Sequence, residues 1–138
     1  METELANELR IAVMRLARRL RQERTDEAYT PSQLSALAVL DNWGPMTPTE
    51  LAARERVQPP SMTRVVAALE AAGLATREPH PVDGRQSVLT VTRAGAKLLA
   101  ADRRRRDAWL AKRLKDLSPE EIAALRAAAP VLDRLWQS

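Results

Sequence analysis

The sequence predicts a mainly α-helical protein with one small β wing of two or three strands. Three segments, which begin at Thr30, Thr47 and Ser118, each carry a proline next and a Glu or Gln three residues on. The hydroxyl can cap a helix, proline fits its first position, and the Glu or Gln completes a capping box. Elsewhere apolar residues recur at helical steps, and only residues 74–91 change to β-prone stretches around an Asp-Gly turn.

The first four helices follow from apolar spacing and from their stop signals. A stripe that runs from Leu5 to Leu20 predicts a helix over residues 3–26. Thr30 and Thr47 begin two shorter helices, over residues 31–42 and 48–55, separated by a run of breakers at residues 42–45. A rigid turn at residues 57–60 then leads into a helix over residues 60–72, which Gly73 ends.

The second half of the chain adds the hairpin and two more helices. Residues 74–78 and 87–91 are the β-prone stretches, and the Asp-Gly dipeptide between them is a hairpin signal. Thr92 caps a long helix that runs to about residue 116, and Ser118 caps a last helix over residues 119–136.

Composition excludes several classes of protein. Of the 138 residues, 45% are hydrophobic and 29% are charged, which is the mix of a folded domain. The chain has no cysteine and one histidine, so we expect no disulfide, no thiol chemistry, no metal site and no cofactor. No apolar run reaches the roughly 18 residues of a membrane span, and the acidic start is unlike a signal peptide. We therefore expect a cytoplasmic protein without a membrane partner, and not an enzyme, because no catalytic motif is present.

The order of the predicted elements is that of a winged helix-turn-helix flanked by long helices. Two short helices joined by a tight turn and followed by a hairpin make up the DNA-binding unit of that fold. Its second helix enters the major groove, and here this helix begins with short hydroxyl residues and an arginine that suits guanine. The predicted contacts on it are Pro60, Ser61, Met62, Thr63 and Arg64. Two alternatives remain open, that Ser61 caps its own helix and that Arg64 pairs with an acid.

The turn of the hairpin predicts a second DNA contact. Asp83 and Gly84 form a narrow turn that presents Arg85, which can enter a minor groove while Asp83 holds either Arg85 or a helix arginine in place. The alternative is a solvated loop in which Asp83 and Gly84 only make the turn. Arg77 completes the predicted DNA-binding set. His80 lies in the same loop between two prolines, where it is either an exposed loop residue or a phosphate contact.

Several segments of the chain resemble the MarR (multiple antibiotic resistance regulator) family. The residues that carry the resemblance are Thr47–Ala52, Ser61 with Thr63–Val66 and Leu69–Glu70, Gly73–Arg77, Asp83–Arg85 and Val88–Gly95. The resemblance covers nearly the whole chain and departs at Gln86, where many members have a second wing arginine. It implies a homodimer that binds palindromic promoter DNA and is released from it by a small phenolic or aromatic acid.

In the family, the ligand binds where the first two helices meet the start of the long helix. Here that region predicts a pocket lined by Met14, Arg18, Leu37 and Trp43, an apolar wall with one partner for a carboxylate. The same four residues have a simpler interpretation, as core side chains and a solvated charge.

We divide the chain into a dimerisation helix (residues 1–28), a winged helix-turn-helix (29–95) and a long helix with a second dimerisation helix (96–138). The terminal helices carry apolar stripes that we expect to pack on each other and on a second copy. The run Arg103–Arg106 points around most of a helix, and we expect it to form ion pairs with acids such as Asp102 and Asp107.

The prediction is thus a homodimeric repressor that a small aromatic or drug-like ligand releases from DNA. The alternative is a winged-helix module without a ligand, which organises DNA or docks another protein.

Overall fold

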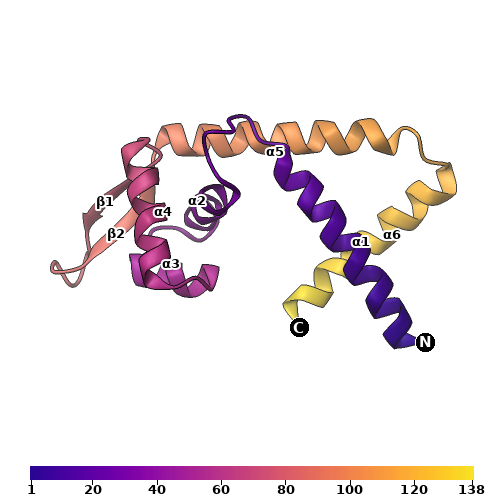
Figure 1. The fold of residues 1–138 in the computed structure, drawn as a ribbon, viewed down its shortest axis with the longest axis horizontal. Helices are drawn as coiled ribbons and strands as arrows, with labels where there is room; N and C mark the ends of the chain where they lie inside the picture. Colours follow the sequence, from indigo (N-terminus) through magenta and orange to yellow (C-terminus); the bar gives the residue numbers. More distant parts are fainter.

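The computed structural model describes residues 1–138 and contains six helices and one two-stranded sheet (Figure 1). In chain order the elements are α1 (Glu2–Gln22), α2 (Pro31–Trp43), α3 (Pro48–Glu55), α4 (Pro59–Ala71), β1 (Ala75–Pro79), β2 (Ser87–Val91), α5 (Arg93–Leu114) and α6 (Pro119–Gln137). Every predicted element is confirmed. The main difference is that α1 ends at Gln22 and not near residue 26.

The three predicted capping boxes are present and set the starts of α2, α3 and α6. The side chains of Thr30, Thr47 and Ser118 each accept a hydrogen bond from the backbone N–H three residues on. In return, the side chain of Gln33, Glu50 or Glu121 accepts a bond from the backbone N–H of the capping residue. These bonds satisfy backbone groups that a helix start otherwise leaves unpaired.

One hydrophobic core holds the winged helix-turn-helix together. Its buried side chains come from α2, α3, α4, the hairpin and the first half of α5. Leu37, Leu51 and Leu69 lie at its centre, from one helix each, with at most 1% of their surface exposed. The hairpin pairs Ala75 with Val91 at its base and Pro79 with Ser87 at its far end. A single β-bridge from Met46 to Leu89 adds a short third segment beside it.

The hairpin and α5 meet the end of α4 in a close contact at Gly95. A β-carbon on Gly95 would collide with the carbonyl oxygen of Leu74, so the approach requires glycine. Thr92 reinforces the contact, since its hydroxyl donates to the Gly73 carbonyl (2.6 Å) and accepts from the Gly95 N–H (3.1 Å). The winged helix-turn-helix is therefore firmly attached to the first turn of α5.

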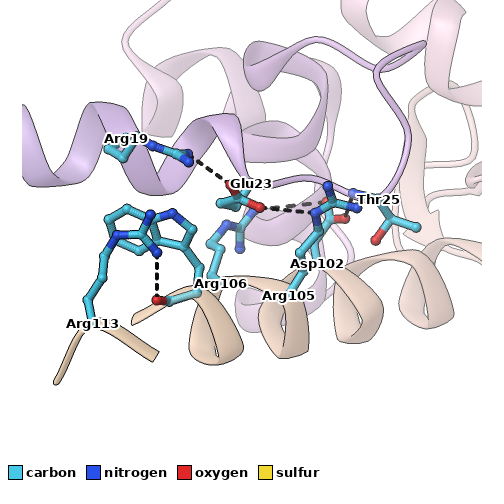
Figure 2. A network of polar contacts seen from close by, with 8 residues as sticks. Arg19, Glu23, Thr25, Asp102, Arg105, Arg106 and Arg113 are labelled. Carbon is cyan, nitrogen blue, oxygen red and sulfur yellow. Dashed lines mark hydrogen bonds and ion pairs between the residues drawn. The ribbon is translucent and has the colours of Figure 1, made fainter. Parts of the chain in front are cut away.

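A buried carboxylate explains why α1 stops early. Asp102 of α5 is fully buried, and its Oδ1 accepts a hydrogen bond from the backbone N–H of Thr25 (2.6 Å; Figure 2). The chain after α1 is therefore held against α5. Because residues 25 and 102 are far apart in sequence, no helix signal near residue 26 could indicate this contact.

The run Arg103–Arg106 of α5 forms ion pairs, but most of its partners lie on other elements and not at the predicted acids Asp102 and Asp107 of α5. Arg105 and Arg19 both pair with Glu23, at 3.1 and 2.9 Å (Figure 2), and Arg103 pairs with Asp41 of α2 at 3.0 Å. Arg106 lies 3.9 Å from Asp102. Asp107 is exposed and takes part in none of these pairs. The run thus links α5 to α2 and to the end of α1, and we call this region the joint.

Beyond the joint, α1 and α6 cross on one side of α5 (Figure 1) and leave an apolar groove between them. The groove has a volume of about 840 Å³. Its apolar lining consists of Leu5, Ala6, Leu9, Val13, Val131, Leu132, Leu135 and Trp136. Trp136 is 70% exposed and Leu135 is 59% exposed, so this chain alone does not bury the stripes of its end helices. None of the helices combines the length and apolarity that a membrane span needs.

Candidate nucleic-acid interface

The N-terminus of α4 presents an exposed polar face. The helix begins at Pro59, its N-cap Gln58 makes no side-chain bond, and Ser61 lies inside the first turn, so Ser61 does not cap the helix. Pro60, Ser61 and Arg64 are exposed, and none of the ion pairs involves Arg64. The exposed Thr63 hydroxyl donates to the Pro59 carbonyl at 2.9 Å and keeps its lone pairs free to accept another bond.

The opposite face of α4 belongs to the core, and this corrects one predicted contact. Met62 is 2% exposed and packs with Val66 and Leu69. The prediction that Met62 contacts DNA is wrong, because its place one turn before Val66 puts it on the buried face of the helix.

At the tip of the wing, the carboxylate of Asp83 holds Arg85 by hydrogen bonds. Asp83 Oδ1 accepts hydrogen bonds from the backbone N–H of Arg85 (3.1 Å) and from its guanidinium Nε (3.2 Å). The backbone N–H bond first, and then the guanidinium bond, lower the pKa of the Asp83 carboxyl, so Asp83 stays charged to a lower pH than an ordinary aspartate. The Arg85 side chain is 92% exposed and projects from the tip.

A polar cleft joins the wing to the start of α3. It has a volume of about 510 Å³ and is lined by Thr47, Pro48, Thr49, Glu50, Arg77, Gln86 and Ser87. The predicted contact Arg77 lies in this cleft, where its Nε donates to Glu70 of α4 at 2.9 Å. The start of α3 was not among the predicted contacts. The capping box of α3 gives no signal of a phosphate contact, because it already pairs the backbone N–H groups of Thr47 and Glu50.

Arg56 is a second residue that the prediction missed. It ends α3 in the left-handed conformation, with φ 54° and ψ 43°, and is the only residue other than glycine with positive φ. Its exposed side chain lies on the turn that joins the two helices of the motif.

The four residues predicted to line a ligand pocket do not share a cavity in this chain. Leu37 is fully buried and belongs to the core, as the alternative interpretation of this residue predicted. Met14 and Arg18 lie on one face of α1. Trp43 is 60% exposed at the end of α2, where the guanidinium of Arg54 stacks 4.3 Å from its ring centre.

A different set of residues forms a small cavity at the joint. It has a volume of about 210 Å³ and lies between α1, α2 and α5. Leu34, Ala38 and Leu99 supply its apolar part, and Arg21, Arg103 and Arg106 supply its charge. The cavity lies in the predicted region of the fold but is lined by other residues. These residues come from three helices and lie together only because the helices pack on one another.

Comparison with known proteins links these features to one group of regulators. The MarR family model matches residues 29–87, which hold α2, α3, α4 and most of the wing. An uncharacterized HTH-type transcriptional regulator of Mycobacterium leprae is 51% identical over 131 residues, or 95% of this chain and 92% of the relative.

Solved structures share the whole architecture. A protein of Pseudomonas aeruginosa, described as a candidate transcriptional regulator, superposes with a TM-score of 0.88 at 34% identity, over 99% of this chain and 96% of its own. A MarR family protein of Bacillus stearothermophilus superposes with a TM-score of 0.81 at 25% identity, over 99% and 95% of the two chains.

Proposed function

Because the chain belongs to the MarR family of winged helix-turn-helix transcriptional regulators, we propose that it is a homodimeric repressor of a palindromic operator. It is a regulator and not an enzyme. We propose further that it acts in the cytoplasm and that a small organic acid releases it from DNA. The observation that carries the proposal is the exposed polar start of α4 beside a wing whose arginine is held by Asp83.

In the proposed complex, the start of α4 enters the major groove and the wing enters the adjacent minor groove. Arg64 can donate two hydrogen bonds to a guanine edge, while Pro60, Ser61 and Thr63 approach bases or phosphates. Arg85, which Asp83 aims outward, suits a narrow minor groove of strong negative potential. Arg77 and Gly84 lie beside these residues and complete the proposed contact surface.

The test is to select binding sites from fragmented genomic DNA and to measure affinity for the operator that this returns. A specific regulator prefers its operator over random DNA by at least about 1,000-fold. A module that only organises DNA binds both about equally, and that result would contradict the proposal.

Two substitutions test the assignment of the contacts. We expect Arg64→Ala to cost about 1–3 kcal/mol of binding free energy and to relax the preference at one base pair. We expect Arg85→Ala to weaken binding in a way that depends on A·T content near the wing. Unchanged operator affinity of Arg85→Ala at physiological salt would remove the wing from the interface.

The apolar groove between α1 and α6 supports the homodimer. Its exposed Leu, Val and Trp side chains come from the two ends of the chain, which lie far from the proposed DNA-binding surface (Figure 1). A two-fold axis at this groove would pair the same face of two copies and set two wings on one side, as a palindrome requires.

The cavity at the joint supports a ligand of defined chemistry. Three arginines around a small apolar floor suit a carboxylate attached to a compact apolar or aromatic body. Its volume of about 210 Å³ favours a molecule smaller than a typical drug. Two of these arginines, Arg103 and Arg106, also make the ion pairs of the joint, so a bound anion would compete with Asp41 and Asp102 for them.

Salicylate is a suitable probe of this cavity. We expect it to lower operator affinity by 5-fold or more, within the range of coupling free energies that regulators show, and Arg21→Ala to remove the effect. If neither salicylate nor other small aromatic acids change operator affinity at millimolar concentration, the ligand part of the proposal fails and the DNA-binding part stands.

A further inference from the structure

The loop of the wing, residues 80–86, is closed by backbone hydrogen bonds around one side chain. The backbone N–H of His80 donates to the Gln86 carbonyl, and the N–H of Gln86 donates to the Asp83 carbonyl, both at 3.0 Å. Pro79 and Pro81 flank His80 and restrict the backbone on both sides of it. The His80 side chain is therefore held in one place relative to the turn.

The imidazole of His80 fills the inside of this turn. Its Nδ1 accepts hydrogen bonds from the backbone N–H groups of Val82 (3.1 Å) and Asp83 (3.0 Å), and the residue is partly buried. An Nδ1 that accepts carries no proton, so these two bonds fit the neutral ring with its hydrogen on Nε2. The expectation of an exposed loop residue or phosphate contact is thus incomplete, because His80 also bonds the turn from within.

These bonds continue to the arginine at the tip. The backbone of Asp83 is held by His80, and the carboxylate of Asp83 in turn holds the backbone N–H and the guanidinium of Arg85. We propose that His80 is the positioning residue of the wing, and that it holds Arg85 ready for DNA only while its imidazole is neutral. This inference rests on the proposed DNA-binding function and adds a pH dependence to it.

Apart from His80, the charged groups around the loop are of residue types that keep their charge near neutral pH. Within the loop these groups are Asp83 and Arg85, and the bonds from Arg85 lower the pKa of the Asp83 carboxyl. On the strands, β1 carries Glu78 and Arg77, and β2 carries no charged residue. On the neighbouring α3, Glu50 shares a cleft with Gln86. Of all these residue types, only histidine ordinarily changes its charge between pH 5 and 8.

Protonation of His80 is incompatible with the observed turn. In the imidazolium both ring nitrogens are donors, so Nδ1 would face two N–H groups and lose both hydrogen bonds. The new positive charge would also attract the Asp83 carboxylate and draw it away from Arg85. We therefore expect the wing to lose its hold on Arg85 as the pH falls through the range in which histidine titrates.

Two substitutions separate the hydrogen bonds from the charge. His80→Asn keeps an acceptor close to the position of Nδ1 and does not titrate, whereas His80→Ala removes the acceptor. Affinity for the selected operator is measured at pH 7.5, 6.5 and 5.5 and constant ionic strength. We expect His80→Asn to bind at least 5-fold more tightly than His80→Ala at every pH. We expect the wild type to lose at least 5-fold relative to His80→Asn between pH 7.5 and 5.5.

Other outcomes contradict the proposal. Failure of asparagine to restore the affinity that alanine loses would show that the acceptor does not position the wing. A wild type that tightens relative to His80→Asn at low pH would show that protonated His80 is a phosphate contact instead.

A measurement without DNA separates this inference from the proposed function. In the free protein, the backbone amide NMR signals of Val82 and Asp83 should titrate together with the His80 ring nitrogens, and these amides should not titrate between pH 5.5 and 7.5 in His80→Asn. Amides that stay unchanged while the wild-type ring titrates would overturn the positioning role. A wild type that binds no genomic fragment at any pH would instead contradict the proposed function, and the NMR titration would still decide the role of His80.

Discussion

Arg56 shows how one residue can combine backbone strain with a position on the helix-turn-helix. Its left-handed conformation at the end of α3 is one that glycine adopts without strain and other residues adopt at a cost. The side chain is exposed and not part of the core, so packing does not explain an arginine here. Its positive charge lies on the turn before α4, where it suits contact with the phosphates of bound DNA.

The first prediction is that Arg56→Gly stabilises the fold. Relief of the left-handed strain, about 1–2 kcal/mol, exceeds the entropic cost of glycine, about 0.5–1 kcal/mol. We expect the free energy of unfolding in urea to rise by about 0.5–1 kcal/mol. Ala53→Gly is the control, because Ala53 is exposed and a glycine inside α3 should lower the free energy of unfolding by about 1 kcal/mol. Equal losses in both variants would contradict the assigned conformation.

The contacts between elements decide how the DNA-binding unit is mounted on the rest of the chain. At one end, the Gly95 backbone of α5 lies directly on the Leu74 carbonyl after α4. Further along α5, Asp102 and Arg105 hold the segment after α1 (Figure 2), and Arg103 pairs with Asp41 of α2. Every one of these contacts involves α5, so this helix connects the winged helix-turn-helix to the segment that follows α1.

The second prediction concerns the contact at Gly95. In Gly95→Ala the added methyl group meets backbone and cannot be accommodated by a side-chain rotation. We expect a loss of about 1–3 kcal/mol in the free energy of unfolding, the range for overpacked sites. Gly84→Ala is the control, because its added carbon meets nothing within 4 Å, and its stability should stay within about 0.5 kcal/mol of the wild type.

The third prediction concerns the pH dependence of the joint. Hydrogen bonds from Arg105, and then from Arg19, lower the pKa of the Glu23 carboxyl below its usual 4.5. A lowered carboxyl pKa contributes stability that is complete above the usual value and is lost as the pH falls through the folded-state pKa. Glu23→Gln should therefore melt at a lower temperature than the wild type at pH 7. The difference should shrink below pH 4.5.

Glu27→Gln is the control for this measurement, because Glu27 is exposed and takes part in none of the ion pairs. A difference between Glu23→Gln and the wild type that stayed constant from pH 7 to pH 3 would exclude the arginine pairs as its source.

At the scale of the whole molecule, one part of the chain buries its apolar side chains and another part leaves them exposed. The DNA-binding unit has a closed core, whereas α1 and α6 leave large apolar side chains exposed in the groove between them. Large exposed apolar patches are typical of interaction sites. The proposed two-fold assembly would cover it and fix the spacing of two DNA-binding units.

The fourth prediction is that Leu132→Arg or Leu9→Arg prevents assembly. Both residues line the groove, where an arginine would leave a charge unpaired against apolar side chains. We expect the variants to sediment as monomers and to bind the operator poorly. Thermal melting of both variants should still show that the DNA-binding unit is folded, because neither residue belongs to the core of that unit. A wild type that sediments as a monomer at micromolar concentration would contradict the dimer itself.

The sequence by itself determined where most elements begin and where the DNA-binding unit lies. Capping boxes, prolines and the Asp-Gly turn act within a few residues, so Thr30, Thr47, Ser118 and the wing were predictable from local spacing alone. The polar face of α4 and the hold of Asp83 on Arg85 followed from the same short-range rules.

Only the tertiary structure decided what lies between distant segments. The packing of the helices places Met62 in the core and buries Asp102 against Thr25. It also brings Arg21, Arg103 and Arg106 together around one cavity. The tertiary structure also revealed that His80 accepts bonds from its own turn. The physical reason is that burial and charge pairing depend on which helices pack together, and hydrogen-bonded residues up to 82 positions apart, such as Glu23 and Arg105, meet only after that packing is complete.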